Sequence, residues 1–107
     1  MGVTKTGKYT EGQSQLSNIF KVLGHPARLA ILQVIIDRHS CICNDMVEEI
    51  GLAQPTISQH LSELKSIGLL KGSIKGKSQC YCIDEEAWSN IQTQFNAFFD
   101  QDVKTLC

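Results

Sequence analysis

The sequence has no apolar run long enough to cross a membrane. A membrane-spanning helix needs about 20 consecutive apolar residues, and no stretch of the 107 residues approaches that length. The N-terminal stretch 1–15 is polar and rich in glycine, threonine and lysine, without the apolar segment that a secretion signal requires. We therefore expect a cytoplasmic protein that makes no contact with a membrane.

The sequence also has almost no net charge. Its formal charge is −1, which taken alone argues weakly against a nucleic-acid partner. The charges are sorted along the chain, however, because residues 54–82 contain four lysines and one acid, whereas residues 84–102 contain five acids and no base. A local basic segment can bind phosphates whatever the total charge is, so nucleic acid remains a candidate partner.

A Cys-x-x-Cys pair is absent, although the chain has five cysteines. Neither a βαβ pattern nor a nucleophile–base pair accompanies the cysteines, so a thiol oxidoreductase is disfavoured and we expect no enzyme. An odd number of cysteines without a secretion signal also argues against a disulfide framework. In a reducing compartment, clustered cysteines more often bind metal or sense redox state.

The length and the hydrophobic spacing predict one domain over residues 14–100, between a flexible arm at 1–13 and a tail at 101–107. Capping residues, glycines and prolines mark the boundaries of its elements. The predicted helices cover residues 14–24, 27–37, 44–51, 55–68 and 84–99, and the predicted strands cover 69–74 and 78–83, with a loop at 38–43. The fold class is mainly α with a β-hairpin wing, in the order α-α-α-α-β-β-α.

The fourth predicted helix has the features of a DNA-reading helix. The third and fourth helices are joined by a turn of helix-turn-helix length. The side chains assigned to the outer face of the fourth are short, amide or basic, which suits base edges and phosphate oxygens, and its N-terminus attracts phosphate. Two lysines at the hairpin tip would contact the flanking backbone. The predicted DNA-binding residues are Gln54, Thr56, Ser58, Gln59, His60, Ser62, Lys65, Lys75 and Lys77.

Two segments carry a family resemblance. His25-Pro-Ala-Arg-Leu-Ala-Ile-Leu and the stretch from Gly51 to Leu70, which contains Gln54-Pro-Thr-Ile-Ser-Gln-His-Leu, resemble the ArsR/SmtB family of bacterial repressors. The similarity covers about residues 14–99. It implies a dimeric winged helix-turn-helix repressor that binds a double-stranded DNA operator without a cofactor and that an inducer releases.

The resemblance also implies that the first and last helices form the dimer interface. This agrees with the residues themselves, since both helices carry more apolar surface than a lone domain of this size would leave bare. The alternative is that these stripes only close the core of the monomer. The predicted interface residues are Leu16, Ile19, Phe20, Leu23, Ile91, Phe95, Phe98 and Phe99.

Cys41-Ile-Cys43 is the most informative pair of cysteines. Family members that sense arsenite, antimonite, cadmium or lead carry a similar Cys-x-Cys at the first helix of the helix-turn-helix, one residue later than here, often followed by a third cysteine where this chain has Val47. On a helix, residues i and i+2 point about 200° apart and cannot chelate together, whereas an extended segment places both sulfurs on one face. A position before Asn44 therefore suits chelation of a soft metalloid or metal.

The remaining ligands are open at this point. Cys80 and Cys82 alternate with inward residues of the second wing strand and form a second possible dithiol. Cys107 or a cysteine of a partner subunit could supply a further ligand. His39 is more simply a loop histidine. The last helix has no histidine, so the Asp/His site of the family's zinc sensors is not implied, and the cysteine pair of its polysulfide sensors is missing from the second and last helices.

Three functions remain in contention. We favour a repressor released from its operator by a thiol-ligated metalloid, with arsenite or antimonite ahead of a soft divalent metal. A second hypothesis replaces the ligand by oxidation, through disulfides among Cys41, Cys43, Cys80 and Cys82. A third uses the winged helix only for contacts with other proteins.

Overall fold

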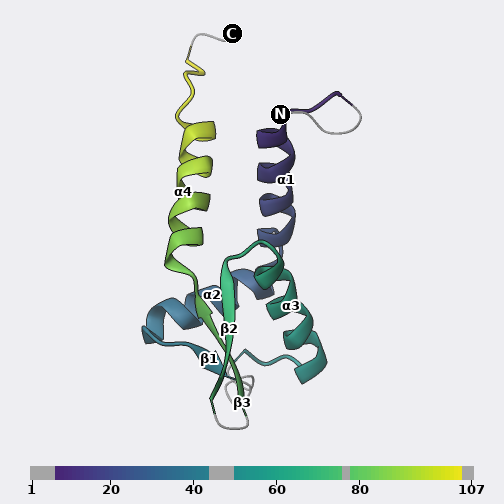
Figure 1. Cartoon of the computed structure of the whole chain (residues 1–107), viewed down its shortest axis with the longest axis vertical. Coiled ribbons are helices and arrows are strands. Elements are labelled where there is room, and N and C mark those ends of the chain that lie inside the picture. Colours follow the sequence, from purple (N-terminus) through teal and green to yellow (C-terminus); the bar gives the residue numbers. More distant parts are fainter. Residues whose placement is uncertain (1–6, 44–49, 76–77, 105–107) are drawn as a thin grey trace.

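The computed structural model of the chain describes residues 7–43, 50–75 and 78–104, with side chains outside 73–78. Four helices and one small antiparallel sheet make up the described part (Figure 1). The elements are α1 (Glu11–Leu23), α2 (Pro26–Arg38), β1 (Ile42–Cys43), α3 (Gln54–Ser66), β2 (Leu70–Lys75), β3 (Ser78–Ile83) and α4 (Glu85–Phe99). The helix predicted over 44–51 lies almost entirely outside the described residues.

Helix α1 begins three residues earlier than predicted. Thr10 caps it, because its side-chain oxygen accepts a hydrogen bond from the Gln13 backbone N–H while the Gln13 side chain accepts one from the Thr10 N–H, both at 3.0 Å. This reciprocal pair satisfies two backbone donors that would otherwise lack partners at the helix start. The start predicted at Ser14 is therefore wrong, and the last residues of the predicted arm belong to the helix.

The sheet contains a strand that the sequence analysis assigned to a loop. β1 pairs antiparallel with β3, and β3 pairs antiparallel with β2, so the strand order is β1-β3-β2. β2 and β3 form the predicted hairpin, with β2 shifted one residue toward the tip. The loop predicted over 38–43 is wrong at Ile42–Cys43, because Ile42 faces Tyr81 and Cys43 faces Cys80 in the register.

The core lies where α1, α2 and α3 meet the sheet. Ile57, Leu61 and Leu64 form the inner stripe of α3, and all three are buried. They join residues of α1, α2, β1 and the start of β2 in one apolar cluster, Val22, Ile31, Leu32, Ile35, Ile42, Leu69 and Leu70. This packing fixes α3 against the body of the domain and leaves its other side in solvent. Helix α2 is not buried on all sides, since Leu29 is 53% exposed.

Helix α4 and the N-terminal half of α1 extend away from this core (Figure 1). They run side by side from the body of the molecule, while α2, α3 and the sheet form its other end (Figure 1). No residue of α4, which is described over its whole length, is buried. The radius of gyration is 16.4 Å, against about 13 Å for a compact domain of this length. Several aromatic side chains of α4 therefore stay about half exposed within a single chain.

No helix in the described ranges is by itself long and apolar enough to span a membrane. Helices α1 and α2 together meet the criterion by length and composition only, and their axes are bent by 84°.

Candidate nucleic-acid interface and cysteine cluster

The outer face of α3 is polar and open to solvent. Six of the predicted DNA-binding residues are exposed on it, namely Gln54, Thr56, Ser58, Gln59, Ser62 and Lys65. The helix starts with a proline in its first turn and without a side-chain cap, so its N-terminal N–H groups remain available to an anion. Gln54 donates a hydrogen bond from Nε2 to the Ser58 Oγ at 3.0 Å, which orders the first turn of this face.

Lysines extend this surface toward the wing. The Lys65 ammonium lies beside β2, 3.4 Å from the position that a Cβ on Gly72 would occupy. Lys71, also on β2, is exposed. Of the two predicted tip residues, Lys75 ends β2 and Lys77 lies outside the described residues. The structure thus brings the helix and the root of the wing together and leaves the contacts of the tip as a prediction.

His60 does not lie on the outer face, contrary to the sequence-based prediction. Its side chain is 7% exposed, because it is three residues after Ile57 and four before Leu64, and so falls on the inner stripe of the helix. Its Nδ1 accepts a hydrogen bond from the Arg28 Nε at 3.1 Å, and its ring lies 4.4 Å from that of His25. Arg28 also donates to the Val22 carbonyl oxygen. His60 therefore fixes α3 to the start of α2.

Arg28 was not singled out by the sequence analysis. Its neighbours in the His-Pro-Ala-Arg segment suggested only a helix start, and indeed His25 Nδ1 accepts a hydrogen bond from the Ala27 N–H. The long-range contact with His60 spans 32 residues and leaves no local pattern in the sequence.

Acid should weaken this contact and destabilise the fold. Burial lowers the pKa of His60 below 6.5, and the neighbouring His25 and Arg28 lower it further. Below about pH 6.5 the unfolded chain binds a proton at this position that the folded chain resists, so stability falls as the pH falls, by at most about 1.4 kcal/mol per pH unit for one proton. Urea unfolding between pH 7.5 and 5 measures this. His60→Asn should flatten the acid branch relative to wild type, whereas the exposed control His39→Asn should keep it.

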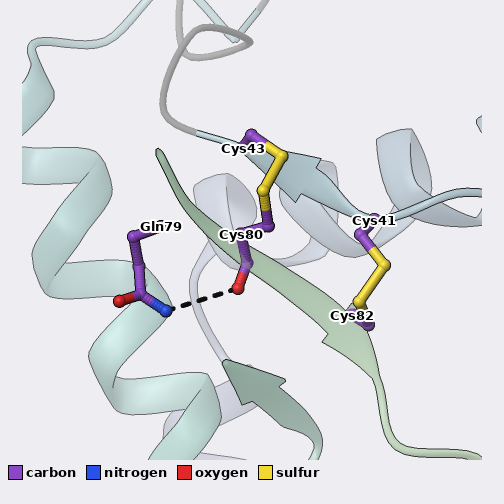
Figure 2. Close-up of a disulfide and its surroundings, with 5 residues drawn as sticks. All are labelled: Cys41, Cys43, Gln79, Cys80 and Cys82. Atoms are coloured by element: carbon purple, nitrogen blue, oxygen red, sulfur yellow. Dashed lines mark hydrogen bonds between the residues drawn. A yellow bond between two sulfur atoms is a disulfide. The ribbon is translucent and has the colours of Figure 1, made fainter. Parts of the chain in front are cut away.

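Four cysteines meet on one face of the sheet. Cys43 forms a disulfide with Cys80, and Cys41 forms one with Cys82, with Cα–Cα distances of 4.0 and 4.3 Å (Figure 2). These short distances are typical of the directly opposite, non-hydrogen-bonded positions of an antiparallel pair. Ile42 and Tyr81, between the two disulfides, contact the core instead. The extended conformation expected for the Cys-x-Cys segment and the common face expected for Cys80 and Cys82 are both present.

The absence of a disulfide framework was wrongly predicted. The sequence argument rested on the odd number of cysteines and on the lack of a secretion signal. The odd cysteine, Cys107, lies outside the described residues. The pairing follows from the β1–β3 register, which places each thiol of the Cys-x-Cys segment opposite a cysteine of the wing strand. Sequence spacing shows the two dithiols but not that they face each other.

The two disulfides differ in their surroundings. Cys80 is completely buried, and its carbonyl oxygen accepts a hydrogen bond from the Gln79 Nε2 at 3.5 Å (Figure 2). Cys41 and Cys82 are partly exposed and line a cavity of about 590 Å³. Within the described part of the chain, no cluster of three or more His, Cys, Asp or Glu side chains is arranged to hold a metal ion. In the disulfide form these four sulfurs offer no thiolate to a metal.

An aromatic cluster covers the faces of α1 and α4 that were predicted to form an interface. The ring of Phe20 lies 5.6 Å from that of Phe95 and 6.4 Å from that of Phe99. Phe95, Phe98 and Phe99 are nevertheless 41%, 49% and 59% exposed. Leu16, Leu23 and Ile91 are half-buried, whereas Ile19 is buried inside the chain at 6% exposure and has almost no surface left for a second subunit.

The sequence is similar to a family of transcriptional regulators. A sequence profile described as "Bacterial regulatory protein, arsR family" matches residues 25–71. An uncharacterized HTH-type transcriptional regulator of Methanocaldococcus jannaschii is 36% identical over 82 residues, which are 76% of this chain and 91% of that protein. The arsenical resistance operon repressor of Staphylococcus xylosus is 30% identical over 93 residues, covering 87% and 88% of the two chains.

The fold has a close match as well. The solution structure of a homodimeric winged helix-turn-helix DNA-binding domain from Mycobacterium bovis, described as a possible ArsR-family transcriptional regulator, has a TM-score of 0.64 at 23% identity. The match covers 86% of this chain and 84% of that one. The predicted winged helix-turn-helix fold is confirmed.

Proposed function

Because this chain belongs to the ArsR family of winged helix-turn-helix transcriptional repressors, we propose that it binds its operator as a homodimer and is released when its cysteines bind a soft metalloid, arsenite above all. The family consists of DNA-binding regulators rather than enzymes. The observation that carries the proposal is the cysteine face of β1 and β3, defined by Cys41, Cys43, Cys80 and Cys82, which joins the segment before α3 to the wing.

The DNA-binding part of the proposal rests on α3. Its inner stripe is packed in the core, so the exposed amide and hydroxyl groups are held on a rigid helix. Such side chains form hydrogen bonds to base edges in the major groove, while lysines neutralise phosphates. The lysines of α3 and β2 would then contact the backbone beside the helix.

The homodimer is supported by the aromatic cluster. Three phenylalanines remain about half exposed after packing within one chain, and α4 has no buried residue. Burying such rings between two identical copies removes apolar surface from water at about 25 cal/mol per Å². A two-fold dimer also presents two copies of α3 to DNA, as a palindromic operator requires. The homodimeric M. bovis domain of the same fold supports this arrangement.

The sensing part requires the reduced protein. Reduction of the two disulfides yields four thiols that are opposite one another in pairs, so two or three sulfurs can converge on one arsenic atom as each thiol displaces a hydroxide as water. Thiolates are the soft ligands that arsenic(III) prefers over harder cations. Drawing these sulfurs around a ligand changes the spacing of β1 and β3. Because β3 is a strand of the wing, this shifts the wing relative to α3 and favours a form with low DNA affinity.

Oxidation is a second candidate input, and the two disulfides favour it. In that case the bonded and the reduced forms would differ in operator affinity without any metalloid. Mild oxidation of the reduced protein should then change operator affinity and remove the mass of two hydrogen atoms for each disulfide formed. Intact mass and anisotropy measured on the same sample separate this input from ligand binding.

Arsenite should release the reduced protein from DNA only when the cysteine face is intact. The experiment titrates arsenite, cadmium and zinc into reduced protein bound to fluorescent DNA from the region upstream of its own gene, read by anisotropy. Wild type and the control Cys107→Ser should release DNA, whereas Cys41→Ser/Cys43→Ser should need about tenfold more arsenite or fail to respond. An identical arsenite response of wild type and the double variant would refute the sensing role.

A further inference from the structure

One cavity of the domain opens directly onto one of the two disulfides. It lies between the end of α2, the end of β3 and the start of α4, and has a volume of about 590 Å³, the size of a small-molecule site. Cys41 and Cys82 line it, whereas Cys43 and Cys80 do not. Its remaining walls include Ile35, Ile36 and Trp88, so a molecule that reaches the disulfide passes an apolar surface.

The rim of this cavity is acidic. Glu85 lines it, and Asp84 and Glu86 flank Glu85 at the start of α4. A helix N-terminus by itself attracts anions. At the start of α4, however, the Asp84 side chain accepts a hydrogen bond from the Ala87 N–H. The three carboxylates there also offset the positive end of the helix dipole. Among the described residues that line the cavity, none is lysine or arginine, and His39 is the basic group. The carboxylates at the start of α4 therefore repel anions on this side of the cavity, while Arg38, next to His39, is a basic neighbour of the opposite side.

We propose that this cavity admits small neutral or cationic thiols to the Cys41–Cys82 disulfide, which they open while Cys43–Cys80 stays closed. The proposal rests on the proposed function in that it takes the cysteine face as the sensing surface, and it names the reductant of that face. The two disulfides then have separate roles. The one beside the cavity responds to the thiol pool. The other, in which Cys80 is buried and Cys43 is partly exposed away from the cavity, holds β1 against the wing strand.

The chemistry is thiol–disulfide exchange. The thiolate of the small molecule attacks one sulfur of the pair, a mixed disulfide forms there, and the Cys41–Cys82 bond breaks. The second cysteine leaves as a thiolate, which takes up the proton that the incoming thiol lost. A second small thiol attacks the mixed disulfide and releases the small molecule as its own disulfide, so two thiols are oxidised and one protein disulfide is reduced. The product is a free Cys41/Cys82 dithiol beside the cavity.

The test measures the opening of each disulfide separately, without DNA. The disulfide-bonded protein is treated with 2-mercaptoethanol, cysteamine or mercaptoacetate at equal thiolate concentration, quenched with iodoacetamide and mapped by mass spectrometry. Cys41 and Cys82 should be alkylated about tenfold faster than Cys43 and Cys80, because exchange depends on access to sulfur. Cysteamine and 2-mercaptoethanol should react faster than the anionic mercaptoacetate.

Charge reversal at the rim identifies the route. Glu85→Lys should raise the rate of mercaptoacetate relative to cysteamine at Cys41–Cys82 several-fold, while the matched control Glu11→Lys, at an exposed position of α1, should keep the wild-type ratio. Equal opening of the two disulfides, or an unchanged ratio in Glu85→Lys, would overturn the proposal. If the Cys41–Cys82 disulfide opens selectively but operator affinity does not change, the cavity route is supported. The same result contradicts the sensing role of the cysteines in the proposed function.

Discussion

Thr56→Ala/Gln59→Ala should lower operator affinity by about 100-fold while leaving the fold intact. Both side chains are exposed on α3, and neither belongs to the apolar core. A well-placed side-chain contact to a base edge contributes about 1–3 kcal/mol, so the loss of two such contacts amounts to roughly 3 kcal/mol, which is about two factors of ten in Kd. Fluorescence anisotropy at fixed salt gives the affinity, and urea unfolding checks the stability.

The matched control removes the same two residue types elsewhere. Gln33→Ala/Thr93→Ala changes exposed positions on α2 and α4, where the side chains form only local hydrogen bonds, to Asp37 and to the Ser89 carbonyl oxygen. Its operator affinity should stay within about twofold of wild type. If both double variants bind the operator equally well, α3 does not contact the bases through this face. The DNA-binding surface must then lie on another part of the protein.

A phosphate contact has a different signature from a base contact. Lys65 lies at the end of α3 next to β2, so it is placed to reach backbone rather than bases. Removing one phosphate contact lowers the slope of log affinity against log salt by about 0.9. A plot of affinity against salt thus assigns each side chain of this surface to phosphate or to base recognition.

Most of the fold followed from local patterns. The amphipathic spacing of Ile57, Leu61 and Leu64, the proline at the start of α2 and the alternation in β3 each identified an element, because burial of one face and the geometry of the backbone are written into short stretches. The early start of α1 could also have been predicted, since Thr10 and Gln13 have the spacing of a capping box. β1 could not have been predicted from local sequence, because a strand of two residues has no periodicity and forms only through its pairing with β3.

The sequence predicted which cysteines belong to the site but not which of them pair with each other. The Cys-x-Cys segment and the two wing cysteines were identified as dithiols, yet which thiol faces which depends on a register between segments separated by 37 residues or more. His60 shows the opposite case. Its spacing from Ile57 and Leu64 already put it on the inner stripe, but its polarity suggested a DNA contact. A buried histidine needs a partner, and Arg28, which supplies it, is distant in the sequence.

Phe98→Glu should shift the protein from dimer to monomer and weaken operator binding as a consequence. The Phe98 ring is 49% exposed and packs in its own chain against Phe99, with centroids 5.1 Å apart. In a two-fold interface the substitution places a carboxylate on both sides, and burying an unpaired charge costs several kcal/mol. The dimer dissociation constant should therefore rise by about 100-fold or more, measured by sedimentation velocity over a concentration series.

The control separates the interface from a general effect of acidity on α4. Thr93→Glu adds the same charge to the same helix, but on the side opposite the phenylalanines, and should leave both the dimer and operator affinity nearly unchanged. Operator binding of Phe98→Glu should recover at protein concentrations high enough to restore the dimer, because α3 itself is untouched. Should Phe98→Glu remain a dimer with wild-type affinity, the exposed rings of α4 do not form the contact between subunits, and the two copies of α3 must be held together by another surface.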